Sequence, residues 1–176
     1  MKQMVTIAGV SSSVLFTHLS ASSKKALDTE LASASSGSKF EVHTAGVLDV
    51  MKSQGVKLDE VCLLDPKAEH ALSPEDGSDD PPRDRTSELR VLGFPNRHLG
   101  SIQMTTDTAL GVTKRVVVDG ESLETIPYVD HPTIRFNAKE SVEMPFRYIT
   151  HPNGEPILPD GMKELLKEDL NKGFDF

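Results

Sequence analysis

Apolar positions in the first 65 residues fall into short runs separated by longer polar stretches, and this pattern predicts alternating helices and strands. The first ten residues are typical of the end of a helix that closes at Gly9. Apolar runs at 14–16, 40–43 and 61–64 predict strands, and residues 24–32 and 46–55 predict helices. Strands that alternate with helices at this spacing indicate an α/β fold with a mostly parallel sheet flanked by helices.

A further helix is predicted to run from Thr105 or Thr106 to about Val118, because either threonine is a suitable N-cap. Three apolar positions of this helix share one face at i, i+3 and i+7 and are expected in the core: Ala109, Val112 and Val116. We expect the basic side chains of Lys114 and Arg115 to be solvated.

Beyond Gly120 the chain is punctuated by prolines, which are spaced too closely for long regular elements. The pattern predicts a tail, residues 120–176, that wraps over the rest of the chain and ends in a short helix at 161–170. A chain of 176 residues is long enough for one sizeable core, so we expect residues 1–176 to form a single domain.

The stretch from 79 to 109, DDPPRDRTSELRVLGFPNRHLGSIQMTTDTA, is unusually dense in turn residues, charges and hydroxyls. The stiff Pro81–Pro82 step directs the charges of 83–85, and the helix opening at 104–108 offers free backbone N–H groups. A third cluster, 143–148, combines aromatic and charged residues in the tail. Each feature alone is more often structural, but the three together favour a ligand pocket at the carboxyl edge of the sheet.

Composition narrows the classes of partner. The net charge is −8, and the chain has two Tyr and no Trp, which disfavours an extended nucleic-acid surface and favours a basic partner. The single cysteine, Cys62, allows no internal disulfide, so we expect a cytoplasmic protein. No apolar run reaches the roughly 18 residues of a membrane span.

Sequence motifs for metals and nucleotides are missing. The six histidines show no close ligand spacing, and we expect no metal site. The chain has no Walker loop, no GxGxxG and no GxSxG nucleophile elbow. The sequence therefore gives no support for a common nucleotide-binding fold or for a serine hydrolase of this type.

Five segments resemble a known family: VCLLDPKAEHALSPEDG, DDPPRDRTSELR, RHLGSIQMTTDTA, IPYVDHPTIRFNAKESVEMPFRY and GEPILPDGM. They are similar to the SPOUT-class, knotted methyltransferase family that includes a fungal protein-arginine methyltransferase. The resemblance is close over about residues 56–165 and looser before them. It implies a C-terminal trefoil knot, S-adenosylmethionine as cofactor, and a basic ribosomal protein of the small subunit as partner.

The resemblance also implies a set of site residues. It places Pro82–Thr86 beside cofactor and substrate, and Leu99–Gly100 and Gln103–Thr108 at the last cofactor loop and the helix after it. Cofactor-binding residues would be Pro82, Arg83, Leu99, Gly100, Gln103, Met104, Thr105, Thr106 and Thr108. Substrate-binding residues would be Arg85, Phe146 and Arg147. A protonated guanidinium is a poor nucleophile, so a carboxylate must orient it, and three acids are candidates: Asp84, Asp107 and Glu143.

The chain departs from the family between Gly77 and Asp79. The family carries a further strand and a glycine-rich loop of the form FDYFxFGGILG there, whereas this sequence runs through Ser78 directly into DDPPRDR. The first strand of the family is also expected to be missing, so the sheet and knot are expected to be incomplete. Three functions therefore stay open: a protein-arginine methyltransferase, a SPOUT RNA methyltransferase, and a truncated, inactive binding protein.

Overall fold

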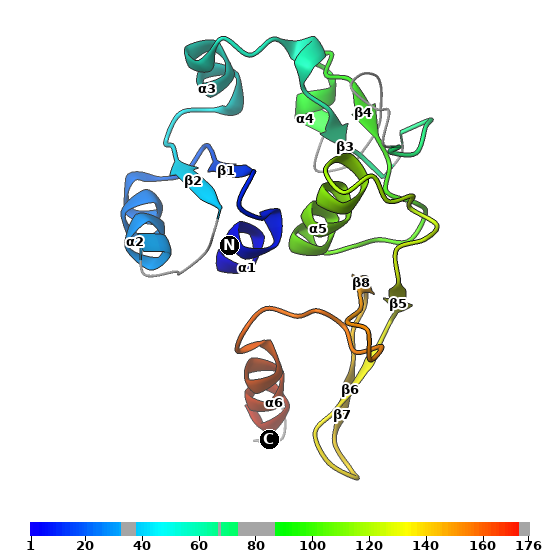
Figure 1. Cartoon of the computed structure of the whole chain (residues 1–176). Helices are drawn as coiled ribbons and strands as arrows, with labels where there is room; N and C mark the ends of the chain where they lie inside the picture. Colours follow the sequence, from blue (N-terminus) through cyan, green and yellow to red (C-terminus); the bar gives the residue numbers. More distant parts are fainter. Residues whose placement is uncertain (33–37, 67, 74–86, 173–176) are drawn as a thin grey trace.

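The computed structural model describes residues 1–32, 38–66, 68–73 and 87–172, with the side chains of 87, 88, 171 and 172 left out of the description. Helices and small sheets alternate along the chain in a mixed α/β arrangement (Figure 1). The predicted α/β class is confirmed at this level. The single mostly parallel sheet is not: the described strands form four separate two-stranded sheets, two parallel and two antiparallel.

The N-terminal part is built on a parallel pair of strands, β1 (Ser13–Phe16) and β2 (Lys39–Val42). Helix α1 (Lys2–Ala8) precedes β1, ends at Gly9 as predicted, and packs on it. Helix α2 (Ala21–Ala32) precedes β2 and begins three residues earlier than predicted, because the Ser20 hydroxyl accepts the N–H of Ser23 at 3.1 Å. One apolar core holds these elements together: Val5, Ala8, Val14, Phe16, Leu31 and Val42.

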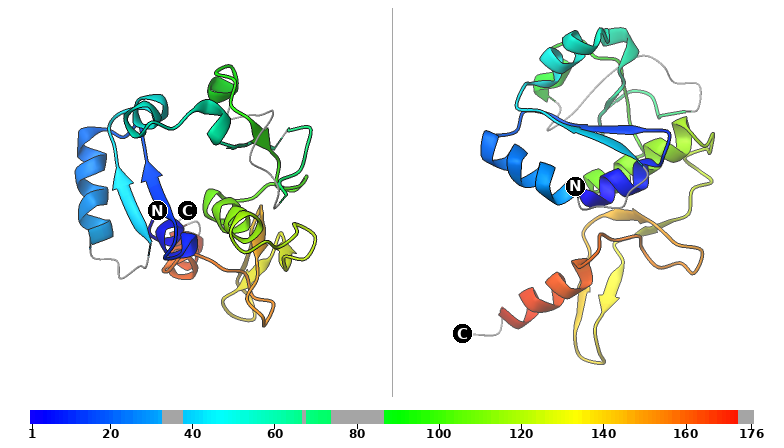
Figure 2. Two further views of the ribbon diagram at one scale, coloured as in Figure 1. Left: turned by 45° about the horizontal axis from the view of Figure 1, so that its top comes forward. Right: turned by 60° about the vertical axis from the view of Figure 1, so that its left-hand side comes forward.

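The second parallel pair is shorter than the sequence predicts. Strand β3 covers only Leu63–Leu64 and pairs with β4 (Asn96–Arg97). The predicted strand began at Val61, but Val61 is the C-cap of a 3-10 turn, η1 (Leu58–Glu60), and its N–H donates to the carbonyl of Leu58 at 3.2 Å. Helix α3 (Val47–Gln54) lies where predicted, and α4 (Ser87–Arg90) precedes β4. In the left view of Figure 2 the β3–β4 pair stands apart from the β1–β2 pair.

Helix α5 (Thr106–Val117) lies where predicted and contacts both the N-terminal helix and the C-terminal strand β8. Val112 and Val116 are fully buried, whereas Ala109 is half-buried. Gly111 allows a close approach: a Cβ there would lie 3.0 Å from Cγ2 of Ile7 in α1 and 3.1 Å from Cδ1 of Ile149. The helix therefore packs between the N-terminal helix and the C-terminal strands.

The C-terminal part contains four short strands that the sequence did not predict. Strand β5 (Tyr128–Asp130) pairs antiparallel with β8 (Arg147–Ile149), and β6 (Thr133–Arg135) pairs antiparallel with β7 (Ser141–Glu143). The prolines flank these strands instead of interrupting them, and the carbonyls of Pro127 and Pro132 accept the N–H groups of Thr150 and Met144. The predicted terminal helix is present as α6 (Met162–Lys172).

Candidate active site

The predicted site residues come from three segments of the chain, and the structure describes two of them. Pro82, Arg83, Asp84 and Arg85 lie outside the described residues. The other two segments, 98–108 and 143–148, lie within the described residues.

The loop that carries Leu99 and Gly100 is fixed by backbone bonds on both sides. The N–H of His98 donates to the carbonyl of His70 at 3.0 Å, and the carbonyl of His98 accepts the N–H of Leu72 at 2.8 Å. Gly100 has a φ of +101°, a conformation that favours glycine, and its N–H donates to Nδ1 of His98 at 2.9 Å. His98, which was not predicted as a site residue, therefore holds the turn.

Thr105 is the N-cap of α5, as predicted, but its side chain does not cap the helix. The hydroxyl of Thr105 donates to the hydroxyl of Thr108 at 2.8 Å instead of accepting a backbone N–H. The backbone N–H groups of the first turn, around Thr106 and Asp107, are left without a side-chain cap. Such N–H groups, with the positive end of the helix dipole, suit an electron-rich group of a ligand.

Two motifs that are distant in sequence meet at the start of β8. The N–H of Arg147 donates to the carbonyl of Gln103 at 2.9 Å, and Met104 forms an isolated β-bridge with Arg147. A Cβ on Gly100 would lie 3.9 Å from Nη1 of Arg147. The structure thus brings four predicted site residues into one place: Gly100, Gln103, Met104 and Arg147.

Arg147 is held by two residues of β5 that sequence reasoning missed. Its Nε and Nη2 donate to the two carboxylate oxygens of Asp130 at 2.6 and 2.8 Å, and its guanidinium carbon lies 4.7 Å from the centre of the Tyr128 ring. The hydrogen bonds from Arg147 lower the pKa of the Asp130 carboxyl, and Asp130 in turn raises the pKa of Arg147. The only sequence signal was the i, i+2 spacing of Tyr128 and Asp130, which puts both side chains on one face of a strand.

The two described acid candidates occupy different places. Asp107 lies in the first turn of α5, half-buried, beside the predicted cofactor residues. Burial raises the pKa of the Tyr148 hydroxyl, and the negative charge of Asp107 adds to that rise. Glu143 is exposed on β7, opposite Thr133. Phe146, predicted to bind substrate, is half-buried and packs with the core cluster of Ile134, Met144 and Tyr148.

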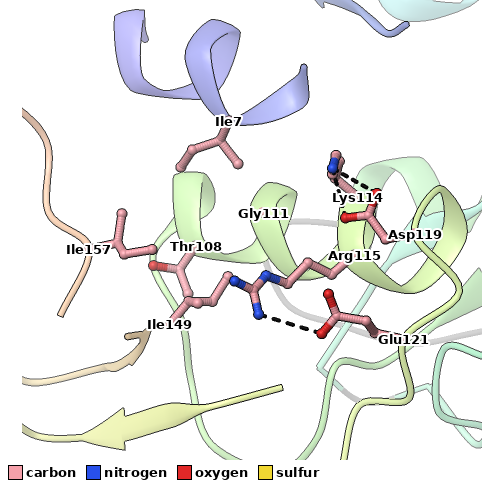
Figure 3. Close-up of a pocket in the computed structure, with 9 residues that line it drawn as sticks. All are labelled: Ile7, Thr108, Gly111, Lys114, Arg115, Asp119, Glu121, Ile149 and Ile157. Carbon is pink, nitrogen blue, oxygen red and sulfur yellow. Dashed lines mark hydrogen bonds and ion pairs between the residues drawn. The ribbon is translucent and has the colours of Figure 1, made fainter. Parts of the chain in front are cut away.

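Two cavities are found among the described residues, and neither is lined by Leu99 or Gly100. One, of about 280 Å³, lies between α1, α5 and β8 (Figure 3), and Thr108 is the one predicted site residue that lines it. Lys114 and Arg115, expected to be solvated, are instead half-buried on its wall in ion pairs with Asp119 and Glu121. The other cavity, of about 290 Å³, has an apolar lining: Val47, Val61, Cys62, Leu63, Leu64, Leu89 and Phe94.

The described part of the chain contains no cluster of three or more His, Cys, Asp or Glu side chains that could hold a metal ion. Over the same residues, no helix is both long enough and apolar enough to cross a membrane.

A glycine turn, an uncapped helix N-terminus and an anchored arginine on an adjoining strand lie close together in a protein of the mixed α/β class. The family model described as SFM1-like protein arginine N-methyltransferase matches residues 2–173, and the chain belongs to this family.

Comparison with individual proteins agrees with this assignment. The chain is 45% identical over 131 residues to protein arginine N-methyltransferase SFM1 of Saccharomyces cerevisiae, a match that covers 65% of this chain and 61% of that protein. The matched part thus spans about three fifths of the length of this relative. Among solved structures, yeast SFM1 complexed with SAM has a TM-score of 0.76 at 34% identity, over 96% of this chain and 83% of the other. A structure described as a novel protein arginine methyltransferase has a TM-score of 0.77 at 34% identity, over 96% and 92%.

Proposed function

We propose that this chain is a protein arginine N-methyltransferase that uses S-adenosylmethionine. Family membership and the similarity to solved yeast SFM1 support the proposal. The structural observation that carries it is the contact between the QMTTDTA and MPFRY segments through the Arg147–Gln103 hydrogen bond of 2.9 Å. This contact puts the Gly100 turn, the N-terminus of α5 and a cationic side chain in one site.

The residues present fit the proposed cofactor. Related structures are described as complexes with SAM, SAH and MTA. In this chain, Gly100 lies beside Arg147, with Nη1 at 3.9 Å from a Cβ built on the glycine, and the neighbouring Leu99 and Met104 are half-buried apolar residues. The uncapped first turn of α5 and the Arg147 guanidinium supply donors for polar groups. When bound, S-adenosylmethionine supplies an electrophilic methyl group on a sulfonium sulfur.

Asp107 is our choice for the acid that acts on the substrate. The substrate guanidinium is a very weak acid and is protonated at neutral pH, so a carboxylate must hold it and accept a proton as the nitrogen takes the methyl group. Asp107 is half-buried in the first turn of α5, among the proposed cofactor residues. Glu143 is exposed on β7, and for this reason we rank it below Asp107.

Several features extend the proposal. We propose that residues 1–176 form one SPOUT-class domain with a C-terminal trefoil knot; the supporting observation is the similarity to the solved structures over 96% of the chain. We also propose a cytoplasmic protein whose substrate is a basic ribosomal protein of the small subunit, with Arg85 and Phe146 on the substrate side. The net charge of −8 suits a basic protein better than RNA.

A methylation assay tests the substrate class directly. Ribosomal protein and ribosomal RNA would be separated, each incubated with the chain and radiolabelled S-adenosylmethionine, and the label followed. We expect label in an arginine of the protein fraction. Label in the RNA fraction alone would replace the proposed function with that of a SPOUT RNA methyltransferase.

One observation favours a second candidate, an inactive binding protein. Among the described residues, β1–β2 and β3–β4 are separate pairs, and solved yeast SFM1 has residues with no counterpart here, since only 83% of it is covered. A family strand inserted between Gly77 and Asp79 would test this candidate. An inactive chain that gains cofactor binding on insertion supports it, whereas an active original chain rules it out.

A further inference from the structure

One nitrogen of the Arg147 guanidinium, Nη1, is not used in the contact with Asp130. Nε and Nη2 are used by the carboxylate of Asp130, while Nη1 makes no hydrogen bond within the residues that the structure describes. Nη1 is also the atom nearest to the space beside Gly100, at 3.9 Å from a Cβ built there. Nη1 is therefore an unused donor that lies beside the proposed cofactor loop.

The position of this nitrogen is fixed from three sides. The backbone of Arg147 is bound to Gln103, its guanidinium is bound in two places by Asp130, and the Tyr128 ring lies under it at 4.7 Å. Only 22% of the Arg147 side chain is exposed. A donor that is ordered before the ligand arrives loses little conformational entropy on binding.

The charge of the pair also suits the site. A free arginine would repel both a sulfonium cofactor and a cationic substrate. The Asp130 carboxylate balances this charge and leaves the hydrogen-bonding capacity of Nη1 intact. The pair can therefore recognise a carboxylate at short range without repelling cationic groups at longer range.

We propose that Nη1 of Arg147 binds the carboxylate at the amino-acid end of the cofactor, and that Asp130 is a positioning residue that aims it. The inference rests on the proposed function and deepens it, because it assigns Arg147 to the cofactor and not to the substrate. It also gives Asp130 and Tyr128 roles that no sequence motif assigned to them.

Two ligands separate this role from a general structural one. S-adenosylhomocysteine carries the carboxylate, whereas methylthioadenosine has the nucleoside and the sulfur but no amino-acid part. Isothermal titration of each into the full chain measures the two affinities. Arg147→Met should weaken S-adenosylhomocysteine binding by tenfold to a hundredfold, as expected for a charge-assisted hydrogen bond, and leave methylthioadenosine binding within about twofold.

Variants of the two supporting residues test the positioning role. Asp130→Asn should also weaken S-adenosylhomocysteine selectively, and more than the matched control Glu121→Gln, which alters another arginine–carboxylate pair. Tyr128→Phe should bind both ligands like the original chain, because the Tyr128 hydroxyl is buried without a hydrogen-bond partner in the described structure. Unchanged methylthioadenosine affinity shows that each variant is folded.

The outcomes are distinct for the two proposals. If the original chain binds neither ligand, the proposed function fails. If it binds both, and Arg147→Met weakens both equally or neither, the cofactor function stands and this inference is overturned. If Arg147→Met loses affinity for a peptide substrate while its affinity for S-adenosylhomocysteine is unchanged, then Arg147 binds the substrate, and this inference is also overturned.

Discussion

The backbone N–H of Arg147 donates a hydrogen bond of 2.9 Å to the carbonyl of Gln103, which joins the start of β8 to the residues that lead into α5. Forty-four positions separate the two residues in the chain. The junction brings the Arg147 side chain beside the Gly100 turn, with Nη1 at 3.9 Å from a Cβ built on Gly100.

Gly100 should matter for the ligand and not only for the fold. Gly100→Ala puts a Cβ at a φ of +101° and toward Arg147, and should lower the free energy of unfolding by about 1–3 kcal/mol. Gly120→Ala is a matched control, since Gly120 has a φ of +73° with no atom within 4 Å of its would-be Cβ. We expect similar losses of stability by urea unfolding, but a loss of S-adenosylhomocysteine affinity in Gly100→Ala alone. Equal affinities in the two variants would remove Gly100 from the cofactor site.

The two described acids should differ in their effect on turnover. Asp107→Asn should lower kcat by about a hundredfold or more with little change in cofactor affinity, because it removes the proposed proton acceptor. Glu143→Gln should change kcat by less than about twofold, because Glu143 is exposed on β7. Steady-state kinetics with an arginine peptide measures both. If Glu143→Gln lowered kcat more than Asp107→Asn did, Glu143 and not Asp107 would be the proton acceptor.

The Asp130–Arg147 pair should give stability a dependence on acid pH. Arg147 lowers the pKa of Asp130 in the folded chain, so the stabilisation is present above the unfolded value of about 4 and is lost as pH falls through the lower folded pKa. Because 37% of the Asp130 side chain is exposed, the contribution should stay below about 1 kcal/mol. Urea unfolding should be measured between pH 2 and 6, a range set by that unfolded value. As the pH is lowered, the free energy of unfolding should fall less steeply in Asp130→Asn than in the original chain. A parallel fall in both would show that the pair does not contribute.

Close packing around Gly111 should make any larger side chain at this position of α5 destabilising. Gly111→Val would push against Ile7 and Ile149 at once, since even a Cβ lies 3.0 and 3.1 Å from them. We expect a loss of about 1–3 kcal/mol, the usual cost of overpacking. Val117→Ala on the same helix, at an exposed position, should cost far less. A fully stable Gly111→Val would mean that α1 moves away from α5 freely.

Local patterns predicted the helices well and the sheets poorly. The boundaries of α5 follow from Thr105 as N-cap and from the apolar spacing of Val112 and Val116, both of which are local signals. The strands β5 to β8 have three residues each, too few for an alternating pattern to be recognised. Their pairing depends on contacts between distant residues, which periodicity does not report.

The same limit applies to the site. Gly100, Gln103, Met104 and Arg147 were predicted because they lie in recognisable segments, and the structure places them together. Asp130 was missed because its role depends on the register of β5 against β8, where it lies opposite Arg147. Phe146 was predicted for its aromatic character in a charged loop, but it packs in a core cluster.

Calorimetric titration of S-adenosylhomocysteine into the full chain is the most direct test of the central claim. We predict saturable binding at one site per chain, weakened in Gly100→Ala and unchanged in Gly120→Ala. Absence of any binding to the folded original chain would contradict the account, because the site built by Gly100, Gln103 and Arg147 would then hold no cofactor.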